Sequence, residues 1–272
     1  MKIRNKEFNI SPGNRAYIMG ILNVTPDSFS DGGRYNNLEK MMEHVDEMVR
    51  DGVDIIDVGG ESTRPGYTMI DEEEEIKRVV PAIKAIRRKY DIPISIDTYK
   101  SKVAREALDA GADIINDIWG LKYDPNMKKL AGERAVPVIL MHNRRERNYK
   151  DFLKDVRTDL EESIQLALNA GIKKENIILD PGIGFAKDTR ENLVLTNNLE
   201  ILMDMGYPVL YAASRKRMIG DVLEVEKNER EEGTMALSVY AMMKGAAFVR
   251  VHNVKGNVQA LKMIEAVRNS KI

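Results

Sequence analysis

The chain contains no cysteine and only one tryptophan among its 272 residues. The absence of cysteine excludes disulfide bonds, zinc–thiolate sites and cysteine nucleophiles. The three histidines, His44, His142 and His252, are far apart in the sequence, and their spacing matches no zinc-binding pattern. We therefore expect no metal site built from protein side chains alone.

An excess of charge of one sign and a long apolar run are also missing. Forty-two Lys and Arg residues balance 43 Asp and Glu residues, which gives a net charge of −1. No overall basic field indicates a nucleic-acid partner, so any groups that bind anions must be local. The first ten residues lack the apolar core of a signal peptide, and no apolar run reaches the length of a membrane span. We expect a cytoplasmic protein that acts on small molecules, with no membrane partner.

Short apolar segments alternate with amphipathic segments along the chain. The predicted strands cover residues 16–24, 55–58, 94–98, 113–118, 137–141, 177–179, 208–213 and 248–252. The predicted helices cover 38–50, 72–90, 101–110, 124–131, 151–170, 191–205, 229–244 and 254–267. This alternation in a chain of 272 residues predicts a parallel (β/α)8 TIM barrel, one domain over residues 1–272. Residues 1–15 form a short leader, which could be a hairpin at the bottom of the barrel.

The alternative fold is an open doubly wound sheet, which concentrates its site at one switch point. Polar residues instead follow nearly every predicted strand. The stretch Ile177–Lys187, sequence IILDPGIGFAK, is the best example, because an apolar strand ends on Asp180 and a glycine-bearing turn follows. Asp97 and Asn116 end two other strands in the same way. These positions favour the barrel, whose active sites lie at the carboxyl ends of the strands.

Asp97, Asn116 and Asp180 should thus face one barrel mouth. Two carboxylates and an amide can bind the edge of a flat, amino-substituted nitrogen heterocycle. The alternative for each residue alone is a helix cap or a turn, at roughly even odds. Three such residues at matching positions favour a binding site.

Positive charge is concentrated after the last two strands, where barrel enzymes commonly hold phosphate. Ser214-Arg215-Lys216-Arg217 follows the seventh strand, and Arg250 and His252 alternate along the eighth, so both point to the same side. We interpret the arginines of the 144–147 segment as solvated, and His142 as more suited to packing than to binding. The segment 182–187 lacks the third glycine of a dinucleotide loop and follows the wrong strand, so we reject a nucleotide site.

Two long polar segments, residues 23–33 and 59–66, follow the first and second strands. Loops of this length inside a compact domain are commonly active-site lids. Their sequences, NVTPDSFSDGG and DVGGESTRPG (the latter from residue 57), resemble the two mobile loops of the dihydropteroate synthase family. DPGIGF at 180–185, SRKR at 214–217 and RVH at 250–252 match the remaining motifs of that family in order. The resemblance runs from residue 16 to the closing helix.

The resemblance implies an enzyme of folate synthesis that joins a hydroxymethyl-dihydropterin pyrophosphate to p-aminobenzoate and releases pyrophosphate. It implies a magnesium ion held partly by Asn23, a homodimer that forms through helices on the barrel wall, and sensitivity to sulfonamides. The implied pterin contacts are Asp97, Asn116, Asp180, Lys216, Met141 and Phe185. The implied pyrophosphate contacts are Asn23, Thr63, Arg250 and His252, and the p-aminobenzoate contacts are Phe29, Thr63, Arg64, Pro65 and Ser214. Asp97, Lys216, Arg250 and Asn23 are the implied catalytic residues.

Three positions depart from the family pattern. Ala186 replaces a common glycine, Met218 a common aromatic residue, and Asn253 a common aspartate at the end of the eighth strand. The last change removes a carboxylate beside Arg250 and His252 and leaves room for a paralogue of reduced activity. One alternative function is a catalytically silent paralogue that binds pterin or a partner protein. Two further alternatives are a methyltransferase of the pterin-binding superfamily, which should lack both long loops, and an aldolase that uses Lys216 as a Schiff base.

Overall fold

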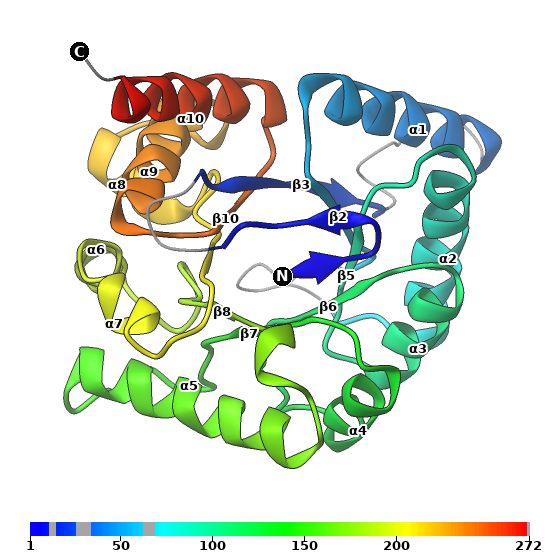
Figure 1. Cartoon of the computed structure of the whole chain (residues 1–272), viewed down its shortest axis with the longest axis horizontal. Coiled ribbons are helices and arrows are strands. Elements are labelled where there is room, and N and C mark those ends of the chain that lie inside the picture. The colour runs from blue at the N-terminus through cyan, green and yellow to red at the C-terminus, as the bar shows by residue number, and fades with distance from the viewer. Residues whose placement is uncertain (11–14, 26–33, 62–68, 271–272) are drawn as a thin grey trace.

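Eight parallel strands form a nearly closed barrel inside a ring of helices in the computed structural model of the chain (Figure 1). The structure describes residues 1–10, 15–25, 34–61 and 69–270. The barrel strands are β3 (Tyr17–Asn23), β4 (Ile55–Gly59), β5 (Ile94–Asp97), β6 (Ile114–Asp117), β7 (Val138–Met141), β8 (Ile177–Asp180), β9 (Leu210–Tyr211) and β10 (Phe248–Val251). The predicted barrel is confirmed, and the open sheet is excluded by the way in which the sheet closes.

Closure occurs at two seams. The first strand of the barrel, β3, pairs with the last, β10, with Phe248 opposite Tyr17. A single parallel bridge between Leu179 and Val209 joins β8 to the segment before β9. The strands are short and rich in Ile, Leu and Val because both of their faces are buried, one inside the barrel and one against the helices.

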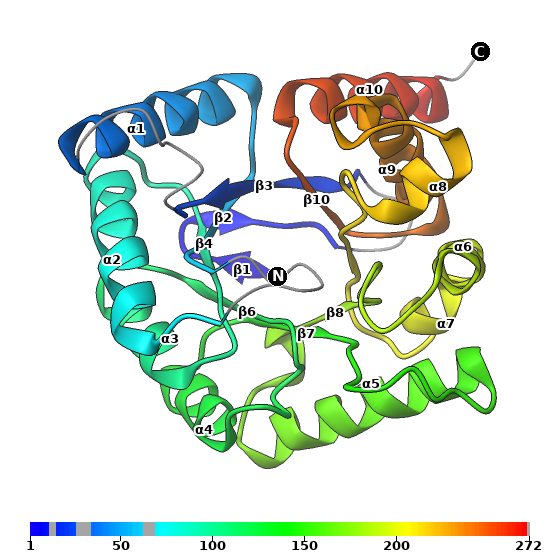
Figure 2. The same cartoon turned by 180° about the vertical axis from the view of Figure 1, so that it is seen from behind.

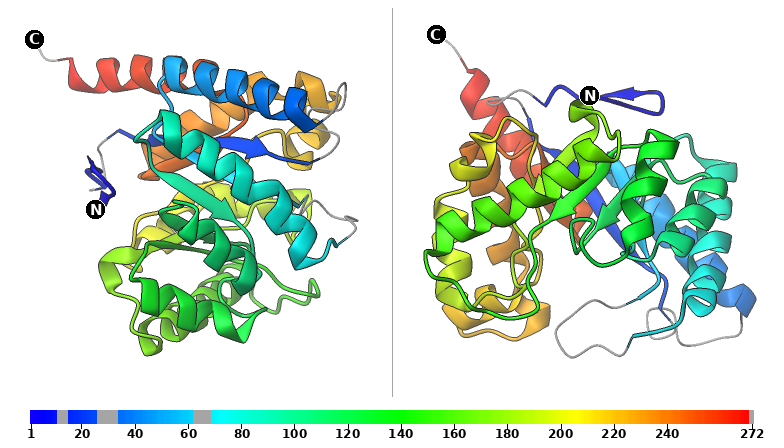
Figure 3. Two further views of the ribbon diagram at one scale, coloured as in Figure 1. Left: turned by 90° about the vertical axis from the view of Figure 1, so that its right-hand side faces the viewer. Right: turned by 90° about the horizontal axis from the view of Figure 1, so that it is seen from below.

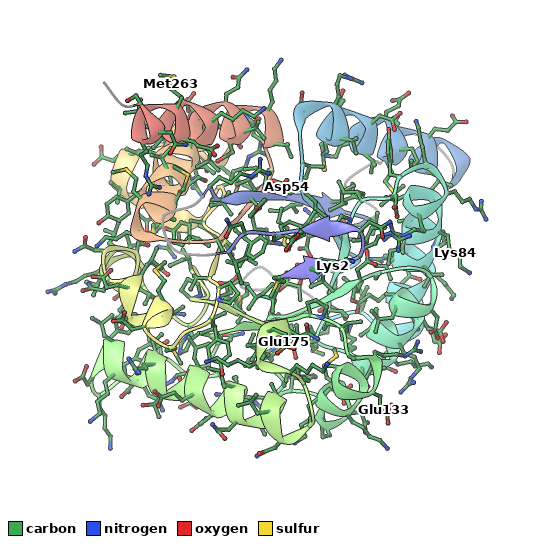
Figure 4. The ribbon with its side chains drawn as sticks, viewed as in Figure 1. Lys2, Asp54, Lys84, Glu133, Glu175 and Met263 are labelled. Atoms are coloured by element: carbon green, nitrogen blue, oxygen red, sulfur yellow. The ribbon has the colours of Figure 1, made fainter. Side chains whose placement is uncertain are left out.

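The helices surround the barrel, as both face-on views show (Figures 1 and 2). They are α1 (Arg34–Asp51), α2 (Glu72–Lys89), α3 (Ser101–Asp109), α4 (Pro125–Arg134), α5 (Phe152–Asn169), α6 (Thr189–Asn197), α7 (Glu200–Met203), α8 (Arg217–Leu223), α9 (Glu231–Lys244) and α10 (Val254–Asn269), with 3-10 turns η2 (Lys174–Asn176) and η3 (Lys227–Glu229). Lys84, Glu133 and Met263 lie on the outer side of this ring (Figure 4). Among the described residues, no helix is long and apolar enough to cross a membrane.

Two helical details differ from the prediction. The helix expected over residues 191–205 is broken into α6 and α7. Asn198 has non-helical backbone angles, and its side-chain amide donates a hydrogen bond to the carbonyl oxygen of Val194, which ends α6. A short helix, α8, follows the Ser214–Lys216 segment where no helix was predicted. It places that segment at the rim of the barrel.

The leader forms the hairpin that the sequence suggested, with strands β1 (Lys2–Ile3) and β2 (Lys6–Glu7). Ile3 and Phe8 are fully buried against the lower barrel layer, which includes Tyr17 and Phe248. Asp54 fixes the adjacent chain, since its carboxylate accepts hydrogen bonds from Lys6 and Arg15. The side views show the hairpin at the end opposite to that toward which β3 points (Figure 3). The bottom of the barrel is therefore covered, and the carboxyl ends of the strands are the end available for a site.

Candidate active site

A cavity of about 1050 Å³ lies at the carboxyl ends of the strands. Its lining contains every predicted site residue that the structure describes: Asn23, Asp97, Asn116, Met141, Asp180, Phe185, Ser214, Lys216, Arg250 and His252. The other four, Phe29, Thr63, Arg64 and Pro65, lie outside the described residues. The structure thus brings the described candidates together, although they come from seven different strands and the loops that follow them.

Strand register explains this convergence. In the parallel ladder, Asn23 is opposite Gly59, Gly59 is opposite Asp97, and Asp97 is opposite Asn116. Four neighbouring strands therefore place these residues in one layer at the barrel mouth. Gly59 contributes no side chain to this layer, which leaves space between Asn23 and Asp97.

The floor of the cavity is a charged network centred on Arg250. Its guanidinium donates to Asp57 through Nε and to Asp97 through Nη2, each at 2.6 Å. The Asn116 amide lies 3.3 Å from the carboxylate of Asp57, whose side chain is fully buried. Sequence reasoning missed Asp57. The available signal was a carboxylate in the middle of the apolar strand Ile55–Gly59, two residues before Gly59 and thus on the same inward side.

The two carboxylate oxygens of Asp97 differ in their hydrogen bonding. Its Oδ2 accepts from Arg250, whereas Oδ1 is buried and has no hydrogen-bond partner within the described parts of the chain. Burial raises the pKa of the Asp97 carboxyl, the positive charge of Arg250 opposes this, and the charge of Asp57 adds to it. A buried acceptor without a partner is costly, so Oδ1 is a position where a ligand N–H would be bound strongly.

Asp180 is held by the turn that follows it. The backbone N–H of Gly182 donates to Asp180 Oδ1 at 2.7 Å. Burial raises the pKa of Asp180 to about 6, although this hydrogen bond and the charges of Lys216 and Arg250 oppose the rise. Gly182 has φ +68°, and a Cβ there would lie 1.9 Å from the carbonyl oxygen of His142. Only glycine therefore allows the loop to pass this close to the segment after β7.

Lys216 and Phe185 form the next part of the wall. The Lys216 ammonium lies 4.3 Å from the centre of the Phe185 ring, within the range of a cation–π contact. A Cβ on Gly184 would lie 3.1 Å from the Lys216 side chain, so the second glycine makes room for this lysine. Phe185 also packs against the buried cluster of Tyr99, Ile118 and Met141. A flat ring placed here would meet both apolar and cationic surfaces.

Ser214 and His252 are directly connected. The backbone N–H of His252 donates to Ser214 Oγ, and Oγ lies 2.9 Å from His252 Nδ1. Oγ can donate to Nδ1 or accept from it, and in either case the contact fixes the orientation of the imidazole.

The interpretation of the arginines of the 144–147 segment as solvated is wrong for Arg144. Arg144 binds the Asp159 carboxylate through Nε at 2.5 Å, and only 20% of its side chain is exposed. Arg147 is solvated as expected, since 51% of its side chain is exposed, and it pairs with Glu191 and Asp188 at the cavity rim. The sequence concealed these pairs because their acidic partners lie on α5 and α6, far along the chain. The expected packing role of His142 is confirmed, since it is buried between Asp159 and Lys187.

The three departures from the family pattern have local explanations. Ala186 has φ +47°, a conformation that glycine adopts more readily, which accounts for glycine being common there. Met218 is buried in the core at the start of α8. Asn253 caps α10, because its side-chain oxygen accepts the N–H of Gly256 at 2.9 Å. Asparagine and aspartate cap helices equally well, so the concern about the lost carboxylate is reduced.

Comparisons with known proteins agree with this site. Residues 19–252 match the family described as pterin binding enzyme. The chain is 57% identical to the dihydropteroate synthase of Clostridium beijerinckii, covering 98% of this chain and 99% of that one. It is 54% identical to the Bacillus subtilis enzyme of the same name, covering 98% and 94%.

Solved structures give the same result. A Clostridium difficile dihydropteroate synthase, crystallised in the presence of pteroic acid, has a TM-score of 0.93 at 49% identity, covering 97% of this chain and 100% of that one. A Xanthomonas albilineans dihydropteroate synthase in complex with 7,8-dihydropteroate has a TM-score of 0.88 at 39% identity, covering 95% of each chain. These likenesses confirm the resemblance drawn from the motifs and set aside the methyltransferase and aldolase alternatives. The chain belongs to the dihydropteroate synthase family of pterin-binding enzymes, which are transferases.

Proposed function

We propose that this cavity condenses a hydroxymethyl-dihydropterin pyrophosphate with p-aminobenzoate to give dihydropteroate and pyrophosphate. The observation that carries the proposal is the buried Asp97 oxygen that lacks a partner among the described residues, in the same cavity as Asn116 and Asp180. A pterin presents ring N–H, amino and carbonyl groups along its edge, and this set of two carboxylates and an amide complements them.

Lys216, Phe185 and Met141 complete the pterin pocket in this proposal. The aromatic and thioether side chains provide apolar contact with the ring faces, and Lys216 provides a donor to a ring carbonyl or nitrogen. The carboxylates also stabilise the positive charge that develops on the ring as the carbon–oxygen bond breaks. Asp97 is best placed for this, because its unpaired oxygen is enclosed in a low-dielectric site.

Pyrophosphate leaves toward Arg250, His252 and Asn23. A guanidinium has five N–H donors, and two of those on Arg250 are used by Asp57 and Asp97, so others remain for an anion. The departing oxygen takes the bonding electron pair and leaves an electron-deficient methylene carbon. The amine of p-aminobenzoate forms the new carbon–nitrogen bond and releases a proton. It is nucleophilic as the free base, so no strong general base is required.

Magnesium fits the residues only as a shared ion. Within the described ranges, no three His, Asp or Glu side chains converge to hold a metal ion. Asn23 offers a single amide oxygen at the cavity wall. Magnesium usually takes few protein ligands and completes its shell with substrate phosphates and water. Bound in this way, it would neutralise charge on the pyrophosphate.

The arylamine site is proposed on Ser214 together with Phe29, Thr63, Arg64 and Pro65, of which the structure describes Ser214. A Yersinia pestis dihydropteroate synthase, 39% identical to this chain with a TM-score of 0.91, has been crystallised in a complex with a sulfonamide drug. We propose that sulfonamides compete with p-aminobenzoate here too. Formation of a homodimer and a cytoplasmic location belong to the same proposal.

The direct test is a coupled assay for pyrophosphate release from the two substrates. Release that requires both substrates, together with dihydropteroate in the products, would support the proposal. The alternative is a paralogue that binds pterin silently. Calorimetric binding of the pterin substrate without product formation would favour that alternative and contradict the synthase.

A further inference from the structure

Lys187, the last residue of the IILDPGIGFAK stretch, makes three hydrogen-bonding contacts through one ammonium group. Its Nζ lies 3.0 Å from the carbonyl oxygens of both Gly182 and Phe185. The same atom lies 2.8 Å from Nδ1 of His142. The reaction described above uses neither Lys187 nor His142, although Lys187 borders the cavity.

The protonation of this group follows from the partner of His142. His142 Nε2 lies 2.9 Å from the Asp159 carboxylate, so Nε2 must carry a hydrogen. Burial lowers the pKa of His142 to about 4, which leaves the imidazole neutral with a lone pair on Nδ1. Lys187 therefore faces three acceptors, and only an ammonium has three hydrogens to donate.

Burial lowers the pKa of Lys187 to about 7, against the attraction of Asp180 and Glu191. The neutral amine, however, would leave one of the three acceptors without a hydrogen. The contacts thus require the charged form.

The loop that Lys187 holds, residues 182–186, contains one proposed pterin contact, Phe185, and is hydrogen-bonded to another, Asp180. The Asp180 carboxylate accepts the N–H of Gly182 in this loop, and the Phe185 ring contacts Lys216. By binding the carbonyls of Gly182 and Phe185, Lys187 fixes the backbone at both points and joins the loop to the segment after β7. Asn192 and Tyr149 support the same loop from outside, at Gly184 N and the Ala186 carbonyl.

We propose that Lys187 is a positioning residue for the pterin half of the reaction, acting through the loop backbone on the Asp180 carboxylate and the Phe185 ring. This inference rests on the proposed function, because it assigns the loop to the pterin. It predicts a loss confined to one substrate. Misplacement of a binding group by about 1 Å can cost up to about 100-fold in activity, so the expected effect is large.

The experiment compares Lys187→Met with a matched control, Arg87→Met. Arg87 is also a partly buried cation that binds backbone carbonyls, those of Gly111 and Ile92, but these residues lie at the amino ends of the strands. Thermal unfolding, calorimetric affinity for the pterin pyrophosphate, and KM for p-aminobenzoate at saturating pterin are measured for each. Lys187→Gln, which keeps two of the donors without the charge, is measured in the same way.

Lys187→Met should weaken pterin affinity by about 10- to 100-fold and leave KM for p-aminobenzoate within about twofold. Lys187→Gln should be intermediate, and Arg87→Met should lower the Tm without changing either constant. Unchanged pterin affinity in a folded Lys187→Met protein would overturn the inference, as would equal weakening for both substrates. A wild-type chain that binds no pterin would instead contradict the proposed function, so the two failures can be told apart.

Discussion

At the scale of single residues, Asp180 links the geometry of the cavity to a measurable pH dependence. Replacement by Ala should weaken binding of the pterin pyrophosphate by about 2–5 kcal/mol, the range for loss of one partner of a buried charged hydrogen bond. Isothermal titration of the folded variant measures this. Affinity equal to that of the wild type would remove Asp180 from the pterin site.

The raised pKa of Asp180, about 6, predicts that pterin affinity falls in acid. The ionised carboxylate accepts the N–H groups of the ligand, so the titration of Asp180 alone should decrease affinity about tenfold from pH 7 to pH 5. This loss cannot be attributed to unfolding through Asp180. The folded protein binds the proton at higher pH than the unfolded chain, whose Asp pKa is near 3.8, so this group stabilises the fold as pH falls from 6 to 4. Asp180→Asn should bind more weakly with a flatter profile, and an equally steep profile would show that another group is responsible.

The glycine loop gives a second prediction at this scale. Ala186→Gly relieves a positive φ of +47° but increases the entropy of the unfolded chain, so the free energy of unfolding should change by less than about 1 kcal/mol. Gly182→Ala combines a positive φ with a Cβ 1.9 Å from the His142 carbonyl. It should cost about 3 kcal/mol or more. Chemical denaturation of both variants checks the contrast, and comparable losses would show that the loop does not depend on this close approach.

How far the sequence could predict the site is clear from Asp97 and Asp57. Asp97, Asn116 and Asp180 were predictable because each ends an apolar strand, and parallel strands end together. Asp57 also had a signal, a carboxylate inside an apolar strand, but its role is defined by its partner Arg250, 193 residues away. Lys187 was hidden for a related reason, since its partner His142 lies 45 residues before it.

At the scale of elements, the junction between β10 and α10 explains why Asn253 is tolerated. Its side chain caps the helix, and Asn253→Ala should cost about 1 kcal/mol in the free energy of unfolding. Asn253→Asp keeps the cap, so stability should change by less than about 1 kcal/mol and kcat/KM should stay within about threefold. A large gain in kcat/KM for the aspartate variant would show instead that the missing carboxylate limits catalysis.

Element boundaries were predictable where caps were visible. Asp71, Asp124 and Asp151 each precede a helix and accept a backbone N–H in its first turn. The break between α6 and α7 was not predicted, because the 3.6-residue apolar pattern continues across it. The helix ends there because the Asn198 side chain donates a hydrogen bond to the Val194 carbonyl. The spacing of apolar residues contains no information about this bond.

At the scale of the whole molecule, we expect the two substrates to bind in order. The pterin contacts come from strand ends and the loops after β8 and β9, whereas most of the proposed arylamine contacts belong to residues 23–33 and 59–66. If pyrophosphate recruits Asn23 and Thr63, p-aminobenzoate should bind better in its presence by about 1–3 kcal/mol. The effect must be reciprocal. Calorimetric titrations of p-aminobenzoate with and without pterin and pyrophosphate measure it, and equal affinities would indicate an arylamine site formed in advance.

The seam between β3 and β10 has a consequence for the synthesis of this protein. One edge of β3 stays unpaired until Phe248–Val251 has been made, because those residues are its partners. Phe8 likewise lacks its aromatic contact with Phe248 until that residue has been made. A nascent chain therefore carries this apolar strand edge unpaired while residues 24–247, between β3 and β10, are made. Such an edge is where chaperones would be needed most, and a chain truncated before residue 248 should aggregate during expression instead of remaining as a shorter folded barrel.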